Sequence, residues 1–346
     1  MKHLFLFFPL LLLLGSCHQK AAQSPEAEPA RQQCNAVYYW KTTFRLSAEE
    51  RDFLATHQVK RLYLRYFDVY KDPDIIASVV PVPQATLQFI DSVPSDLEVV
   101  PTVFIDNNLF KDCDMSQYAG LLVNRILTMT QTNDVPNVHE VQLDCDWTQT
   151  TERSYFNFLR KVDSLLHINT TIPFAPTTLS TTIRLHQLKT KVPPVERGVL
   201  MCYNTGGIRN PETGNSILAA SDVSLYAKNL QSYSLPLDVA YPAFSWAVWF
   251  SGNKFQALLR DLTPENESLT LISENRYKVK EGFYQEGKYL SAGDEIRFEA
   301  SDFEQIMQAK SLLEKQLQNY SIILYHLDSN NLSKYSEDEI NKIYAR

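Results

Sequence analysis

The chain has 346 residues, of which 44% are hydrophobic and 12% aromatic, and its formal net charge is −7 at pH 7. A mildly acidic protein without a run of basic residues does not match the phosphate backbone, so nucleic acid is excluded as an expected partner. The length fits one large domain or two modest ones, with ample apolar material for a core.

The first residues predict a lipoprotein signal peptide over residues 1–16. A short basic start precedes an apolar run, residues 4–14, which has signal-peptide length and is too short to span a bilayer. Residues 14–17, Leu-Gly-Ser-Cys, resemble the bacterial lipobox, and this resemblance implies cleavage before Cys17 and lipidation of that cysteine. An ordinary secretory signal with an incidental cysteine is the alternative.

Residues 17–35 predict a flexible tether, because they are mostly polar, contain Ala and Pro, and show no apolar period. Acyl chains such as palmitate on Cys17 would then anchor a soluble domain, residues 36–346, to a membrane surface without spanning it. The expected location is the bacterial cell envelope, in the periplasm or at the outer membrane.

The domain alternates short apolar strands with amphipathic helices. Strands are predicted at 37–44, 61–69, 99–106, 140–147, 171–179, 198–204, 237–244 and 321–328. Helices are predicted after capping boxes at 47–50 and 301–304, and from helical spacing at 118–129, 151–162 and 221–233. About eight such units predict an α/β fold, a (β/α)8 TIM barrel. An open doubly wound sheet is the rival, but no Gly-rich phosphate loop supports it.

One connection is much longer than the others. Residues 245–300 separate the seventh strand from the last helix and contain several short strand patterns. A loop of this length is rarely structureless in a compact domain, so a small β-rich insertion between strands 7 and 8 is predicted beside the barrel mouth.

The segment 140–148, EVQLDCDWT, carries the most chemical information. Val141 and Leu143 make it a buried strand, and Asp144 and Asp146, two residues apart, point to the same face. Two carboxylates at the carboxyl end of a strand that feeds a helix are typical of the active mouth of a TIM barrel. Helix capping by these aspartates is the structural alternative.

Three further residues follow neighbouring strands. Arg184 either clamps a carboxylate or phosphate group of a ligand, or pairs with Asp144 or Asp146. Tyr203 ends the sixth strand, and Asn204 either binds ligand or shapes the turn that follows. No Cys/His cluster has zinc spacing, so neither a metal nor another cofactor is expected, and whether Cys34 and Cys113 pair stays open.

Three motifs resemble the chitinase-like glycoside hydrolases of family 18. Asp144-Cys-Asp146-Trp-Thr148 is similar to that family's Asp-x-Asp-x-Glu, and residues 201–204, MCYN, are similar to its Met-x-Tyr-Asp. Residues 241–246, YPAFSW, resemble its seventh-strand pattern. The resemblance implies a TIM barrel that acts on or binds carbohydrate, with Asp144 and Asp146 as catalytic candidates. The ligand-binding candidates are Trp147, Arg184, Tyr203, Asn204, Tyr241 and Trp246.

The sequence departs from this family at its general acid. Thr148 stands where the glutamate that protonates the leaving oxygen belongs, so the family's mechanism cannot run through this position. A closer resemblance, to uncharacterised bacterial lipoproteins with a QLDxD strand, implies the fold and the compartment but no activity. A divergent glycosidase and a non-catalytic envelope lipoprotein that binds a glycan or another small polar ligand therefore both remain open.

Overall fold

A computed structural model describes residues 33–72, 74, 80–168 and 178–346. The predicted signal peptide, Cys17 and nearly all of the predicted tether lie outside these residues. Within the described part of the chain, no helix is long and apolar enough to cross a membrane.

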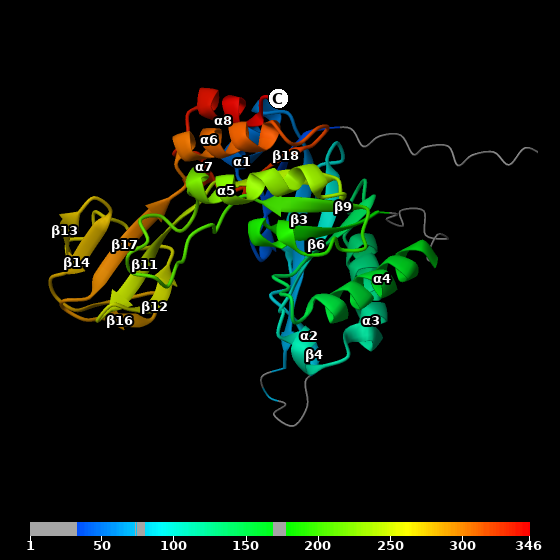
Figure 1. Ribbon diagram of the computed structural model, residues 1–346, viewed down its shortest axis with the longest axis horizontal. Coiled ribbons are helices and arrows are strands. Elements are labelled where there is room, and N and C mark those ends of the chain that lie inside the picture. Colours follow the sequence, from blue (N-terminus) through cyan, green and yellow to red (C-terminus); the bar gives the residue numbers. More distant parts are fainter. Residues whose placement is uncertain (1–32, 73, 75–79, 169–177) are drawn as a thin grey trace, which may run out of the picture. The chain divides into compact units, whose positions relative to one another are not determined.

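Eight parallel strands form a closed barrel, which confirms the predicted fold class (Figure 1). The ring closes because β1 pairs with both β18 and β3. In chain order the barrel strands are β1 Asn35–Tyr39, β3 Val59–Lys71, β6 Glu98–Ile105, β7 Glu140–Asp144, β8 Thr178–Arg184, β9 Arg197–Met201, β10 Leu237–Pro242 and β18 Ile322–Tyr325. Since the strands are parallel, their carboxyl ends share one end of the barrel, called the mouth below.

Helices accompany most of the crossovers. They are α1 Ala48–Thr56, α2 Leu109–Asp112, α3 Tyr118–Thr132, α4 Glu152–Ile168, α5 Ala220–Ala227, α6 Phe303–Glu314, α7 Ser329–Leu332 and α8 Glu337–Tyr344, with 3-10 helices η1 Met115–Gln117, η2 Leu185–Lys189 and η3 Lys228–Ser232. Between β8 and β9 only η2 is present among the described residues. The described chain between β3 and β6 holds β4 Pro81–Gln84, antiparallel to β3, and β5 Gln88–Phe89, which pairs with β2 Thr43–Phe44.

Three predicted elements need correction. The first strand was predicted at 37–44, but β1 ends at Tyr39, and residues 43–44 form β2, which pairs with β5 in a separate sheet. The fifth strand was predicted at 171–179, but β8 spans Thr178–Arg184, and residues 171–177 lie outside the described residues. The capping box predicted at 301–304 is wrong in its capping residue. Asp302 caps α6 by accepting the Gln305 N–H, because the Ser301 hydroxyl is already bonded to the backbone of Phe244.

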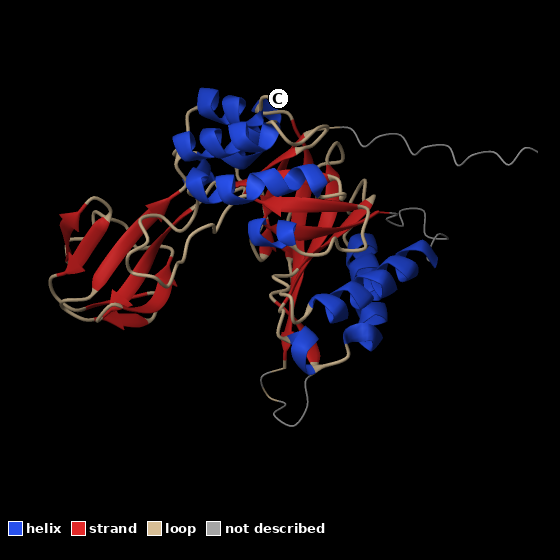
Figure 2. Ribbon diagram, viewed as in Figure 1, coloured by secondary structure: helices blue, strands red, loops and turns tan. Residues whose placement is uncertain are grey.

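The segment between β10 and β18 is a small β structure with its own core. Its strands are β11 Ser245–Ser251, β12 Lys254–Leu259, β13 Leu269–Ser273, β14 Arg276–Val279, β15 Phe283–Gln285, β16 Lys288–Leu290 and β17 Glu295–Ala300, and Figure 2 draws it as strands and loops. A separate apolar cluster fills it, comprising Ala247, Leu259, Leu262, Leu269, Val279, Leu290 and Ile296. This segment, called the insertion below, therefore buries apolar surface independently of the barrel core.

The four described cysteines are free thiols. Cys34 lies just before β1, at the amino end of the barrel strands, whereas Cys113 follows β6 and α2, beyond the carboxyl ends. Opposite ends of a barrel are too far apart for a disulfide, which requires Cα atoms within about 7 Å.

Candidate functional site

Strand β7 directs Asp144 into the barrel interior. Glu140, Gln142 and Asp144 alternate with Val141 and Leu143, so the polar side chains share the inner face. Tyr38 of β1 donates a hydrogen bond of 2.6 Å to Gln142 Oε1 across the interior. Asp144 itself is only 5% exposed and accepts a 2.7 Å hydrogen bond from Thr182 Oγ1 of β8.

The environment of Asp144 favours its neutral form. Burial raises the pKa of the Asp144 carboxyl to about 7, and the neighbouring Asp146 carboxylate acts in the same direction, while Arg184 and the Thr182 hydroxyl act in the opposite one. A carboxyl group with this pKa exchanges its proton near neutral pH. Such groups concentrate at functional sites because neutral-pH proton transfer requires them.

Asp146 forms a bidentate ion pair with Arg184, the last residue of β8. Arg184 Nε lies 2.6 Å from Asp146 Oδ1, and Nη2 lies 3.1 Å from Oδ2. The sequence left two roles open for Arg184, and the structure shows the pairing with Asp146. The Asp146 side chain is still 50% exposed, so the pair lies at the surface of the mouth above the buried Asp144.

Aromatic rings form a continuous cluster at the mouth. Tyr203 stacks on Tyr325 with ring centroids 5.0 Å apart, and Tyr325 contacts Trp40 at 5.7 Å and Phe244 at 5.8 Å. Trp246 extends the cluster through Phe244, at 5.0 Å. These five residues are called the aromatic cluster below.

Tyr203 connects the aromatic cluster to the charged groups. The Arg184 guanidinium lies 5.9 Å from the centroid of the Tyr203 ring. The Tyr203 side chain is 3% exposed, and its hydroxyl oxygen has no hydrogen-bond partner among the described residues. A buried hydroxyl without a partner costs free energy, so a polar group that reached this atom would be stabilised by it.

Sequence reasoning missed Tyr325 and Thr182 as members of this site. Tyr325 closes the last barrel strand, and Thr182 lies on the same strand face as Arg184, two residues away. The alternation of β8 would have indicated Thr182, but the strand was predicted too early in the chain. Nothing local distinguishes Tyr325 from the other aromatic residues of the sequence.

Two candidate residues lie outside the group. Trp147 is 0% exposed and packs edge-on against Phe156 of α4 with ring centroids 5.2 Å apart. Tyr241 is also fully buried, and the groups that raise its pKa, after burial itself, are Cys202, Tyr320 and Glu314 rather than any charge of the mouth. Their ligand-binding roles stay predictions that the present geometry does not favour.

Asn204 and Thr148 are exposed residues that follow β9 and β7. Asn204 has φ of +53°, a left-handed conformation that asparagine tolerates better than most residues, so a turn role accounts for it without a ligand. Thr148 Oγ1 lies 2.9 Å from Thr150 Oγ1, and the Thr148 carbonyl accepts the backbone N–H of Glu152 at the start of α4.

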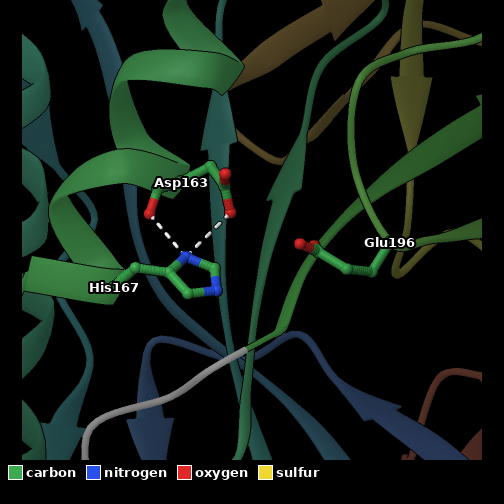
Figure 3. A group of neighbouring side chains, drawn as sticks. All are labelled: Asp163, His167 and Glu196. Carbon is green, nitrogen blue, oxygen red and sulfur yellow. Dashed lines mark hydrogen bonds and ion pairs between the residues drawn. The ribbon is translucent and has the colours of Figure 1, made fainter. Parts of the chain in front are cut away.

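A second polar group lies at the other end of the barrel. Asp163 and His167 near the end of α4 lie beside Glu196, which precedes β9 (Figure 3). His167 Nδ1 is 2.9 Å from the Asp163 carbonyl oxygen, and Glu196 accepts the Leu179 N–H at 2.9 Å. The first contact lies within α4 and the second joins the start of β9 to β8, so both are structural, and structural contacts are typical of that end of a barrel. We therefore assign it no ligand.

Comparisons with known proteins identify the fold. No protein-family model matches the sequence, and no curated protein matches it either. Among solved structures, the class V chitinase of Nicotiana tobaccum, determined as a mutant in complex with NAG4, is similar with a TM-score of 0.52 and 9% identity. The match covers 91% of this chain and 99% of the chitinase.

Two other barrels are similar over nearly their whole length. A glycoside hydrolase family 18 N-acetylglucosaminidase from Paenibacillus barengoltzii matches with a TM-score of 0.51 and 10% identity, over 90% of this chain and 100% of the enzyme. The chitinase-like agglutinin of Robinia pseudoacacia matches with a TM-score of 0.50 and 10% identity, over 90% and 99% of the two chains. The chain therefore has the chitinase-like fold of glycoside hydrolase family 18.

Proposed function

We propose that this protein binds a carbohydrate at the barrel mouth, between the Asp146–Arg184 pair and the aromatic cluster. The unpartnered hydroxyl of the buried Tyr203 carries the proposal, because a sugar hydroxyl or acetamido group would supply the missing hydrogen bond. The apolar faces of sugar rings suit tyrosine and tryptophan rings, which combine apolar area with a polar edge. Another small polar ligand that carries hydroxyl or amide groups would fit the site on the same grounds.

Binding without turnover is the form that we favour. Thr148 replaces the glutamate of the resembled hydrolases, and the Asp146 carboxylate is held in an ion pair with Arg184. The similar barrels include proteins named as hydrolases and one named as an agglutinin, so the fold itself does not decide between the two activities. A divergent glycosidase is the second candidate, and the pKa of about 7 at Asp144 supports it, because that carboxyl could supply a proton.

Tyr203→Phe tests the proposed binding mode. We expect the variant to bind NAG4 about tenfold more weakly, since it cannot hydrogen-bond the ligand, and to be as stable as the wild type or about 1 kcal/mol more stable. Calorimetric titration and thermal unfolding measure the two quantities. Tyr226→Phe is the matched control, because Tyr226 belongs to α5 on the outside of the barrel. An unchanged NAG4 affinity in Tyr203→Phe would contradict the proposal.

We also propose that lipidation of Cys17 holds the protein at the bacterial envelope membrane, because this cysteine lies three residues after an apolar run of signal-peptide length. The wild type should partition into the detergent phase, and Cys17→Ala should remain uncleaved or appear in the aqueous phase, since the acyl chains supply the anchor. Detergent phase separation and mass spectrometry of the amino-terminal peptide measure this. A water-soluble wild type with an unmodified Cys17 would refute the anchoring.

A further inference from the structure

We propose that Glu299 of the insertion is a positioning residue for the barrel mouth. It fixes Trp246 of the aromatic cluster and, at the same time, the loop 205–219 that follows Tyr203 and Asn204. This inference rests on the proposed carbohydrate site and adds that the insertion is part of that site.

Both oxygens of the Glu299 carboxylate are fully used. Oε2 accepts the Trp246 indole N–H at 2.7 Å and the Ser216 hydroxyl. Oε1 accepts the Ser216 backbone N–H at 3.0 Å and Arg297 Nε at 2.6 Å. The residue is 2% exposed, so this carboxylate is surrounded by donors in a site from which water is largely excluded.

The bond to Trp246 sets the orientation of a ring at the mouth. The Trp246 ring contacts Phe244, and Phe244 in turn contacts Tyr325. Phe244 also packs edge-on against Tyr203, with ring centroids 6.0 Å apart. A charged acceptor holds an indole N–H more strongly than a neutral one does. Loss of this acceptor would free the Trp246 ring to rotate without removing any apolar surface.

The insertion also holds the loop 205–219 through two arginines. Arg297 donates to the carbonyl oxygens of Ile208 at 3.1 Å and Asn210 at 2.8 Å. Arg276 donates to the carbonyl oxygens of Thr213, at 3.2 Å, and Pro211. Glu299 accepts a hydrogen bond from Arg297 Nε, while the other guanidinium nitrogens of Arg297 bind the loop. One carboxylate therefore connects the Trp246 ring with the loop 205–219.

The test compares two carboxylates that hold indoles of the same strand. Glu299→Gln keeps the side-chain volume but removes the charge. Asp294→Asn is the matched control, because Asp294 Oδ2 accepts the Trp249 N–H at 2.8 Å, and Trp249 packs on the core of the insertion rather than at the mouth. We expect Glu299→Gln to weaken NAG4 binding about tenfold and Asp294→Asn to leave it within about twofold of the wild type. Both variants should lower the melting temperature.

The decisive comparison is the NAG4 affinity of Glu299→Gln against that of Asp294→Asn, under conditions in which both variants are folded. Equal NAG4 affinities in Glu299→Gln and the wild type would overturn the inference, as would equal losses in both carboxylate variants. If Glu299→Gln does not fold, Ser216→Ala replaces it, because that variant removes one donor to Oε2 and leaves the Arg297 pair intact. An unchanged affinity in Ser216→Ala would then refute the coupling between loop and ring.

A spectroscopic readout separates this inference from the proposed function. A wild type that binds no NAG4 would refute the carbohydrate site alone. Acrylamide quenching of Trp246, taken as the difference from the matching Trp246→Phe protein, then decides the positioning role. We expect quenching to rise in Glu299→Gln and not in Asp294→Asn, and equal quenching in the wild type and Glu299→Gln would overturn the inference.

Discussion

The free energy of unfolding of Asp144→Asn, relative to that of the wild type, should increase by about 3 kcal/mol between pH 5 and pH 8. The folded-state pKa of Asp144 is about 7, above the ordinary aspartate value of 3.8. Between these two values the folded protein keeps a proton that the unfolded chain has lost, so the wild type loses stability as the pH rises. Asparagine is neutral at every pH and lacks this loss. Urea unfolding at pH 5, 6, 7 and 8 measures the difference.

The same substitution should weaken NAG4 binding by about tenfold to a hundredfold, because it removes the ionisable group that lies beneath the Asp146–Arg184 pair. A stability gain combined with a binding loss separates a functional carboxyl from a helix cap, whose removal costs stability and leaves affinity unchanged. Thr182→Val is the companion variant. It removes a hydrogen bond that lowers the pKa of Asp144, so that pKa should be higher in the variant. The loss of stability with rising pH should then continue to a higher pH in Thr182→Val than in the wild type. A stability difference between Asp144→Asn and the wild type that does not change with pH would contradict the raised pKa of Asp144.

Thr148→Glu should make this protein a slow hydrolase of N-acetylglucosamine chains if it binds carbohydrate as proposed. The change places a carboxylic acid after β7, at the position where the resembled enzymes carry their general acid, and general acids contribute about a hundredfold or more to rate. An acidic residue is also favourable beside the amino end of α4, so the fold should tolerate it. Release of reducing sugar from NAG4 measures the gain.

Thr150→Glu is the control for that experiment, because residue 150 is an exposed threonine two positions further along. Hydrolysis by Thr148→Glu alone would show that the scaffold lost its activity with one residue. Hydrolysis by the wild type at a similar rate would instead favour the divergent glycosidase, with Asp144 as the proton donor.

Local periodicity was enough to predict the barrel and the strand that carries the carboxylates. Alternation in the segment 140–144 predicted a buried strand with its polar side chains on one face, and strand–helix repetition predicted parallel strands whose ends meet at one mouth. The length of the connection 245–300 indicated a folded segment, because long structureless loops are rare in compact domains. These predictions needed only neighbours in the chain.

Which of those residues form a site depends on contacts between strands that lie far apart in the chain. Asp146 and Arg184 come from different strands, and Tyr203 and Tyr325 meet only because β9 and β18 flank β10 in the closed barrel. The position of β8 was missed for the same reason: its bounds are set by pairing with β7 and β9, not by its own residues. The complete burial of Trp147 and Tyr241 likewise follows from packing between layers, which no local pattern encodes.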